Sequence, residues 1–138
     1  MQNNLNDKAE ILMETLPFMR RYSNKVIVIK FGGHAMGKKE YVKTFAQDVS
    51  LLQQVGILPI VVHGGGPQIG EMLKKLKIES NFIDGLRVTD AATIDVVEMV
   101  LCGIINKSIV SAISNEGANA VGISGKDGNL ISAKRLSV

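Results

Sequence analysis

A lysine and two runs of glycine follow two apolar segments of the chain. Residues 26–29 are Val-Ile-Val-Ile and lead into Lys30 and then the pair at 32–33, while the apolar residues 57–62 lead into a glycine run at 64–66. Glycine has no side chain, so backbone N–H groups there can approach an anion closely. The pattern predicts a site for carboxylate and phosphate groups, with Lys30 as its mobile cation.

Two further features fit such a site. A helix that begins at Pro67 would add the positive end of its dipole. Arg87, in the stretch Gly-Leu-Arg-Val-Thr-Asp at 85–90, is the best candidate for a clamp, because a guanidinium can hold a carboxylate by two parallel hydrogen bonds. Two plainer interpretations stay open: Arg87 as a surface arginine near a helix start, and Lys30 as a strand-end lysine that extends to water.

Two nucleotide-binding motifs fail in detail. Residues 32–39 nearly match a P-loop, but Lys39 stands where a magnesium-binding Ser or Thr is needed. Residues 64–70 have Ile69 where a dinucleotide fingerprint needs its third glycine. A P-loop nucleotide hydrolase is therefore disfavoured.

Composition narrows the class of protein. The 138 residues are 46% hydrophobic with a net charge of +3, which is typical of one globular domain. The scattered basic residues and few aromatics argue against nucleic-acid binding. Cys102 is the single cysteine, and no His/Cys cluster has the spacing of metal ligands. An acidic N-terminal region and the lack of a long uncharged apolar run predict a soluble, cytoplasmic protein without membrane association.

The site must be positioned by alternating strands and helices. Their order predicts a layered α/β domain with a mainly parallel sheet, in which ligands lie beyond the carboxyl ends of the strands. A bend is expected near Gly103 and Asn106, within the longest helix. The apolar periodicity and turn residues predict strands at 26–31, 57–62, 120–123 and 130–133, and a hairpin or irregular segment at 81–88. They predict helices at 39–55, ended by Gly56, and at 67–76, and a long helix capped by Thr89 or Asp90 and closed by Gly117.

An amphipathic helix precedes the first strand. Leu5, Ala9, Leu12, Leu16 and Met19 recur at spacings of four and three, so they form one apolar stripe. The stripe favours packing on the same domain over serving as an arm for another subunit.

Four stretches, at 30–36, 61–69, 85–90 and 122–128, resemble the N-terminal half of the acetylglutamate kinases, a branch of the amino-acid kinase family, and occur in that family's order. The resemblance implies an α/β/α layered fold of the carbamate kinase-like type, truncated after its first lobe. Residues 1–24 would be a helical extension and residues 25–138 the acetylglutamate-binding lobe, with the C-terminal nucleotide lobe absent. The isolated chain is therefore expected to be inactive.

The resemblance also implies a reaction, the phosphorylation of the side-chain carboxylate of N-acetyl-L-glutamate by ATP with Mg²⁺, in arginine biosynthesis. Lys30 would be catalytic, stabilising the transferring phosphoryl group, and no protein ligand for the metal is identified. Arg87 would hold the substrate's other carboxylate. Backbone amides would bind the remaining oxygens, with Gly32, Gly33 and Gly64 cradling the phosphoryl group and Gly65 and Gly66 holding the substrate.

Alternatives remain within and outside the family. The chain could act on a different carboxylate or carbamate, or could be a non-catalytic acetylglutamate-binding or regulatory module. The N-terminal helix resembles the extension of the arginine-inhibited branch, which implies a homo-oligomer, a hexamer with arginine feedback.

Overall fold

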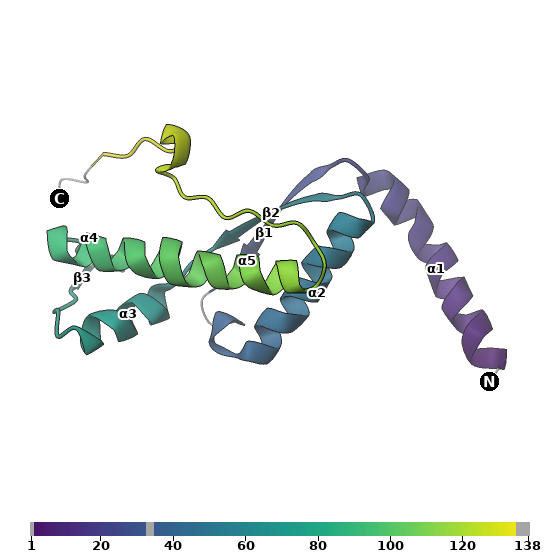
Figure 1. The fold of residues 1–138 in the computed structure, drawn as a ribbon, viewed down its shortest axis with the longest axis horizontal. Coiled ribbons are helices and arrows are strands. Elements are labelled where there is room, and N and C mark those ends of the chain that lie inside the picture. The colour runs from purple at the N-terminus through teal and green to yellow at the C-terminus, as the bar shows by residue number, and fades with distance from the viewer. Residues whose placement is uncertain (1, 33–34, 135–138) are drawn as a thin grey trace.

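The computed structural model describes residues 2–32 and 35–134 (Figure 1). The roles predicted for Gly33 and for His34 therefore lie outside the described residues. In chain order the elements are α1 (Gln2–Tyr22), β1 (Val26–Phe31), η1 (Ala35–Gly37), α2 (Lys39–Gln54), β2 (Leu58–His63), α3 (Gly66–Lys75), β3 (Phe82–Ile83), β4 (Leu86–Arg87), α4 (Ala91–Glu98), η2 (Met99–Ile105), α5 (Asn106–Asn115) and η3 (Asp127–Asn129).

The central sheet pairs β1 with β2 in parallel, from Val26 opposite Leu58 to Phe31 opposite His63. Side chains of a strand alternate between its two faces, and Phe31 is buried on the face that α2 covers. The α/β class with a parallel sheet is therefore confirmed.

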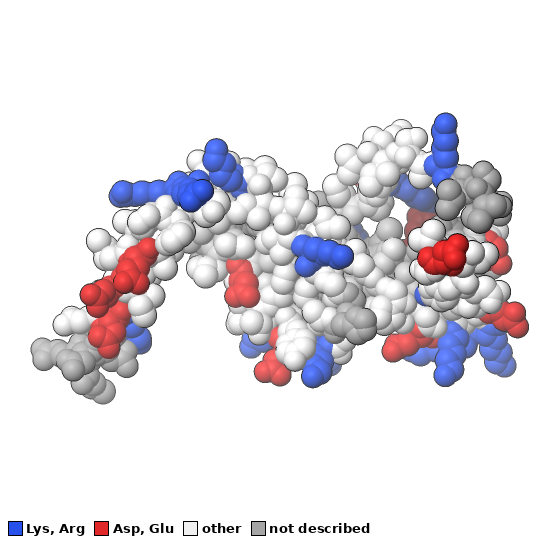
Figure 2. Space-filling view, turned by 180° about the vertical axis from the view of Figure 1, so that it is seen from behind, with Lys and Arg blue, Asp and Glu red and all other residues white. Residues whose placement is uncertain are grey.

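The opposite face of this sheet is apolar and uncovered in the part of the chain described here. Its five apolar side chains are 50–64% exposed, and from behind the molecule shows a largely uncharged surface between charged margins (Figure 2). They are Val26, Val28, Leu58, Ile60 and Val62. Helices thus cover only one side of the two described strands.

The long helix that crosses the sheet is continuous through α4, η2 and α5 (Figure 1). The middle segment, η2, is a π-helix, in which hydrogen bonds span five residues. Val100 and Ile105 are both buried although five residues separate them, and the wider π turn brings them to one face. A local π-helix therefore stands where the sequence predicted a bend.

This helix, Ala91–Asn115, has a mean hydropathy of 1.8, so its length and composition would allow it to cross a membrane. Core helices of soluble proteins can have the same length and hydropathy. Here Val96, Val100, Ile109 and Ile113 are buried in the protein core, so the feature is weak support for membrane insertion.

Local signals place the other element ends. Asp90 is the N-cap of α4 and accepts a hydrogen bond of 2.8 Å from the Thr93 backbone N–H. Gly56 follows α2 with a φ of +87°, which glycine adopts without strain. Pro67 stands in the first turn of α3. The hairpin expected at 81–88 is formed by β3 and β4.

The strands predicted at 120–123 and 130–133 are wrong, since neither segment is a strand. Backbone groups at 119–123 bond to side chains instead. Asn106 Nδ2 donates to the Ile123 carbonyl at 3.4 Å and Lys107 Nζ to the Gly122 carbonyl at 3.1 Å. A cavity of about 310 Å³ lies between this segment and β2.

Helix α1 projects away from the remainder of the molecule (Figure 1). Leu5, Leu12 and Phe18 are 62–67% exposed. The prediction that this helix packs on its own domain is therefore wrong for most of its length, because Leu5, Ala9 and Leu12 of the stripe are exposed. The other two stripe residues, Leu16 and Met19, are half-buried.

Candidate functional site

The two glycine turns lie side by side at the carboxyl end of the sheet. Phe31 and His63 are opposite one another at the ends of β1 and β2, and Gly32 and Gly64 follow them. The Gly64 backbone N–H donates to the Phe31 carbonyl at 3.4 Å. Because parallel strands end at one edge of a sheet, Gly32 and the run at 64–66, predicted separately from sequence, lie at the same edge, and their backbone is called the glycine surface below.

The N-terminus of α3 continues this surface. Gly65 is its N-cap and supplies no side-chain hydrogen bond, so backbone donors of the first turn have no side-chain cap. A Cβ at Gly65 would lie 2.5 Å from Ile105 Cδ1 and 2.7 Å from Leu101 Cδ2, whereas one at Gly66 would meet nothing within 4 Å. Helix segment η2 therefore fixes Gly65, while Gly66 is open to a ligand.

Lys30 lies at the same edge but on the other face. It is opposite Val62 in the parallel register and is exposed, and strand alternation separates it from buried Phe31. Lys30 has no ion-pair or hydrogen-bond partner among the described residues. Its ammonium is therefore available to a ligand above the edge.

Arg87 lies on the hairpin of β3 and β4, opposite Phe82. Its guanidinium carbon is 4.5 Å from the centroid of the Phe82 ring, and its Nη1 donates a hydrogen bond to Ser80 Oγ. The nearest atom to a Cβ built at Gly70 of α3 is Arg87 Nη2, at 4.0 Å. The guanidinium thus lies against α3.

Gly70 is one helical turn beyond Gly66, so both are on the same face of α3. The Arg87 guanidinium, which lies near Gly70, is therefore on the side of α3 that Gly66 faces, as the predicted site requires. Lys30 shares the edge with that surface, on the opposite side of the sheet.

The loop after residue 123 bonds mainly to itself and to α4. The backbone N–H of Ser124 donates to Asp127 and, with the Ser124 hydroxyl, lowers the pKa of that carboxyl. Lys126 pairs with Glu98, and the hydrogen bond and charge of that carboxylate raise the pKa of Lys126. The Lys126 ammonium is therefore paired with a carboxylate of the same chain rather than left for a ligand.

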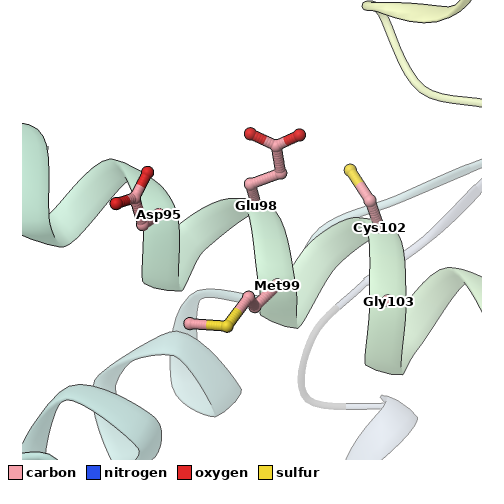
Figure 3. A pocket seen from close by; sticks show the side chains of 5 residues that line it. All are labelled: Asp95, Glu98, Met99, Cys102 and Gly103. Carbon is pink, nitrogen blue, oxygen red and sulfur yellow. The ribbon is translucent and has the colours of Figure 1, made fainter.

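A shallow hollow of about 520 Å³ lies on the outer side of the long helix (Figure 3). Asp95, Glu98 and Cys102 project to one side there. Its carboxylates would repel an anion, so it is not the predicted site. No group of three or more His, Cys, Asp or Glu side chains could hold a metal within the described ranges.

Three residues beside Arg87 escaped the sequence analysis. Ser80 and Phe82 carried no motif of their own. Gly70 did offer a signal, since a glycine inside a helical pattern often marks a close approach by another group. An Asp84-Gly85 pair between short apolar runs was the available signal for the hairpin that aligns Phe82 with Arg87.

The chain is similar in sequence to curated proteins over most of its length. It is 66% identical over 129 residues to an acetylglutamate kinase of Rhodospirillum rubrum, covering 94% of this chain and 42% of that protein. It is 60% identical over 130 residues to one of Saccharophagus degradans, covering 94% and 43%. The chain thus spans less than half the length of these curated relatives.

A solved structure shows the same fold. It is N-acetylglutamate synthase of Neisseria gonorrhoeae, complexed with coenzyme A and N-acetyl-glutamate, with a TM-score of 0.64 and 21% sequence identity, over 77% of this chain and 24% of that one. The sequence profile of the amino acid kinase family matches residues 25–137.

Proposed function

The chain belongs to the amino acid kinase family, and on this premise we propose that it supplies the substrate-binding part of an ATP-dependent N-acetyl-L-glutamate kinase. The reaction would transfer a phosphoryl group to the side-chain carboxylate, a step of arginine biosynthesis in the cytoplasm. Support comes from the relatives named acetylglutamate kinase and from the joining of the two glycine turns by the Gly64 to Phe31 hydrogen bond.

The chemistry needs positioning more than proton transfer. A carboxylate is already ionised at neutral pH, so it can attack without a general base. The difficulty is to bring two anions together in line, which fixed N–H donors and positive charge can achieve. This matches a sheet edge that offers backbone amides, with the Arg87 guanidinium toward the glycine surface and the Lys30 ammonium on the other side of the sheet.

Each residue has a proposed part in that task. Lys30 stabilises the charge of the transferring phosphoryl group, and Arg87 holds the carboxylate that does not react. Backbone donors of the two turns bind the other oxygens: Gly32, Gly33 and Gly64 those of the phosphoryl group, and Gly65 and Gly66 those of the substrate.

ATP would enter with Mg²⁺ on its phosphates, where the metal neutralises charge. The described side chains do not fit a protein-bound magnesium site, since they form no carboxylate cluster. We therefore assign the metal to the nucleotide rather than to ligands from this chain.

Helix α1 is proposed as the arm of a homo-oligomer, a hexamer with arginine feedback. Its uncovered apolar side chains support this. Removal of residues 1–24 should then reduce both the assembly size and any response to arginine, and persistence of both would rule the arm out.

Calorimetric titration tests the substrate assignment. The chain should bind N-acetyl-L-glutamate saturably, and its α-methyl ester much more weakly, because the ester removes the carboxylate assigned to Arg87. ATP should bind with little affinity. Equal binding of acid and ester, or binding of ATP alone, would contradict the proposal.

A further inference from the structure

We propose that Ser80 and Phe82 are positioning residues, which hold the Arg87 guanidinium ready for a carboxylate ligand. The inference rests on the proposed function, because it takes Arg87 as the group that binds the second carboxylate of the substrate. It adds two residues that touch the guanidinium rather than the substrate.

The hairpin turn brings the first of these residues to Arg87. Asp84 and Gly85 have φ values of +49° and +79°, the left-handed conformation that a two-residue hairpin loop requires. A loop of this length fixes the pairing register, so Phe82 lies directly opposite Arg87. Directly opposed residues share one face of a hairpin, which explains the 4.5 Å separation of ring centroid and guanidinium carbon.

The second residue restrains the guanidinium by a hydrogen bond. Arg87 Nη1 donates to Ser80 Oγ, while the Phe82 ring restricts the guanidinium carbon from the side that it covers. A guanidinium has five N–H donors, so the bond to Ser80 leaves four for a ligand. Two uncharged contacts thus orient the group and leave most of its N–H donors for a ligand.

Charge distinguishes this arrangement from a structural ion pair. Within residues 2–32 and 35–134, the recorded ion pair joins Lys126 to Glu98, and no carboxylate pairs with Arg87. Ser80 and Phe82 carry no charge. The positive charge of Arg87 is therefore oriented but not neutralised, as a carboxylate-binding arginine requires.

The contact with α3 gives the guanidinium its direction. Arg87 Nη2 approaches Gly70, one turn from Gly66 at the start of the helix. A ligand bound at that helix start would meet the guanidinium alongside it. Loss of Ser80 or Phe82 would let Arg87 swing away from this place, since the hairpin is otherwise exposed.

Nitrogen-15 relaxation of arginine side chains measures this restraint without any ligand. The chain has only four arginines, so the Nε–Hε signals are few, and exposed Arg20 on α1 serves as the mobile reference. We expect Arg87 to be more ordered than Arg20. Ser80→Ala and Phe82→Leu should reduce its order, while Ser80→Thr and Phe82→Tyr should preserve it.

Ile83→Ala is the matched control, because Ile83 is exposed on the other face of the same hairpin. Binding of N-acetyl-L-glutamate is then measured in the same variants. Arg87→Ala should weaken it by about 100-fold, and Ser80→Ala by about threefold to tenfold. Ser80→Ala should add nothing in the Arg87→Ala background, since its effect acts through the guanidinium.

The outcomes separate this inference from the proposed function. If Arg87 is as mobile as Arg20, or if Ser80→Ala leaves its order unchanged, the positioning role is wrong. If order falls but affinity does not, while Arg87→Ala still weakens binding, the positioning role is again wrong and the proposed function stands. If Arg87→Ala leaves affinity unchanged, the proposed function fails.

Discussion

Phe31, the last residue of β1, stacks on Phe45 of α2, with ring centroids 3.9 Å apart and an interplanar angle of 2°. This contact fixes the end of the strand against the helical layer. The residue before it, Lys30, is thereby held on the uncovered face. The same contact anchors the carbonyl that accepts the Gly64 hydrogen bond, so the packing of one aromatic pair sets both parts of the candidate site.

Removal of that anchor should destabilise the fold. Phe31 is only 5% exposed, so Phe31→Ala should cost about 3–5 kcal/mol in the free energy of unfolding. Phe31→Leu keeps most of the apolar volume and should cost about 1–2 kcal/mol. Urea denaturation measures both, and a loss of less than about 1 kcal/mol in Phe31→Ala would contradict the anchoring role of this contact.

Lys30→Ala should abolish most phosphoryl transfer while keeping the fold. In a kinase-active protein that contains this stretch, kcat should fall by about 10²- to 10³-fold. Because Lys30 is exposed, the free energy of unfolding should change by less than about 0.5 kcal/mol. Lys25→Ala, at another exposed lysine, is the matched control, and near-normal turnover of Lys30→Ala would refute the catalytic assignment.

Adjacent glycines should respond differently to a methyl group. Gly65→Ala would clash with Leu101 and Ile105 and should destabilise the protein by about 1–3 kcal/mol. A Cβ at Gly66 meets nothing within 4 Å, so Gly66→Ala should leave stability nearly unchanged but obstruct the ligand. Thermal unfolding and N-acetyl-L-glutamate titration separate these effects, and unchanged affinity in Gly66→Ala would count against the surface.

The cap of α4 should make stability depend on acid pH. Hydrogen bonds from the Thr93 hydroxyl and backbone N–H lower the pKa of Asp90. A carboxyl with a lowered pKa in the folded state stabilises it above the ordinary Asp value, about 3.9, and this stabilisation is lost as pH falls through the folded value.

Asp90→Asn keeps the capping oxygen without the charge, so this part of the pH dependence should vanish. Asp90→Ala should lower the melting temperature even at neutral pH. The melting temperature is measured at a series of pH values from about 2 to about 7, a range that includes the ordinary Asp pKa. An unchanged acid profile in Asp90→Asn would show that other carboxyls dominate.

Local signals in the sequence predicted much of this architecture. The cap at Asp90, the glycine after α2 and the proline in the first turn of α3 depend on backbone conformation over a few residues, which neighbouring side chains largely determine. The alternation of apolar strands and helices gave the α/β class for the same reason. These signals also located the glycine surface, since strand ends and turns are local features.

Features that depend on distant partners were harder to predict. The apolar run at 120–123 has a strand-like pattern, yet Asn106 and Lys107 take carbonyls that strand pairing would use. The π-helix depends on the joint burial of Val100 and Ile105, and only their five-residue spacing hinted at it. The hydrogen bond from Arg87 to Ser80 joins residues seven apart, and Ser80 stands outside any motif.

The most direct test of the central claim is a nitrogen-15 chemical-shift titration with N-acetyl-L-glutamate. One anion site at the sheet edge predicts saturable shifts of the backbone N–H signals of Gly64, Gly65 and Gly66 together with Arg87 Nε–Hε, all with one dissociation constant. Arg87→Ala should abolish or greatly weaken the glycine shifts. Shifts confined to other parts of the molecule, or glycine shifts that persist unchanged without Arg87, would contradict the account.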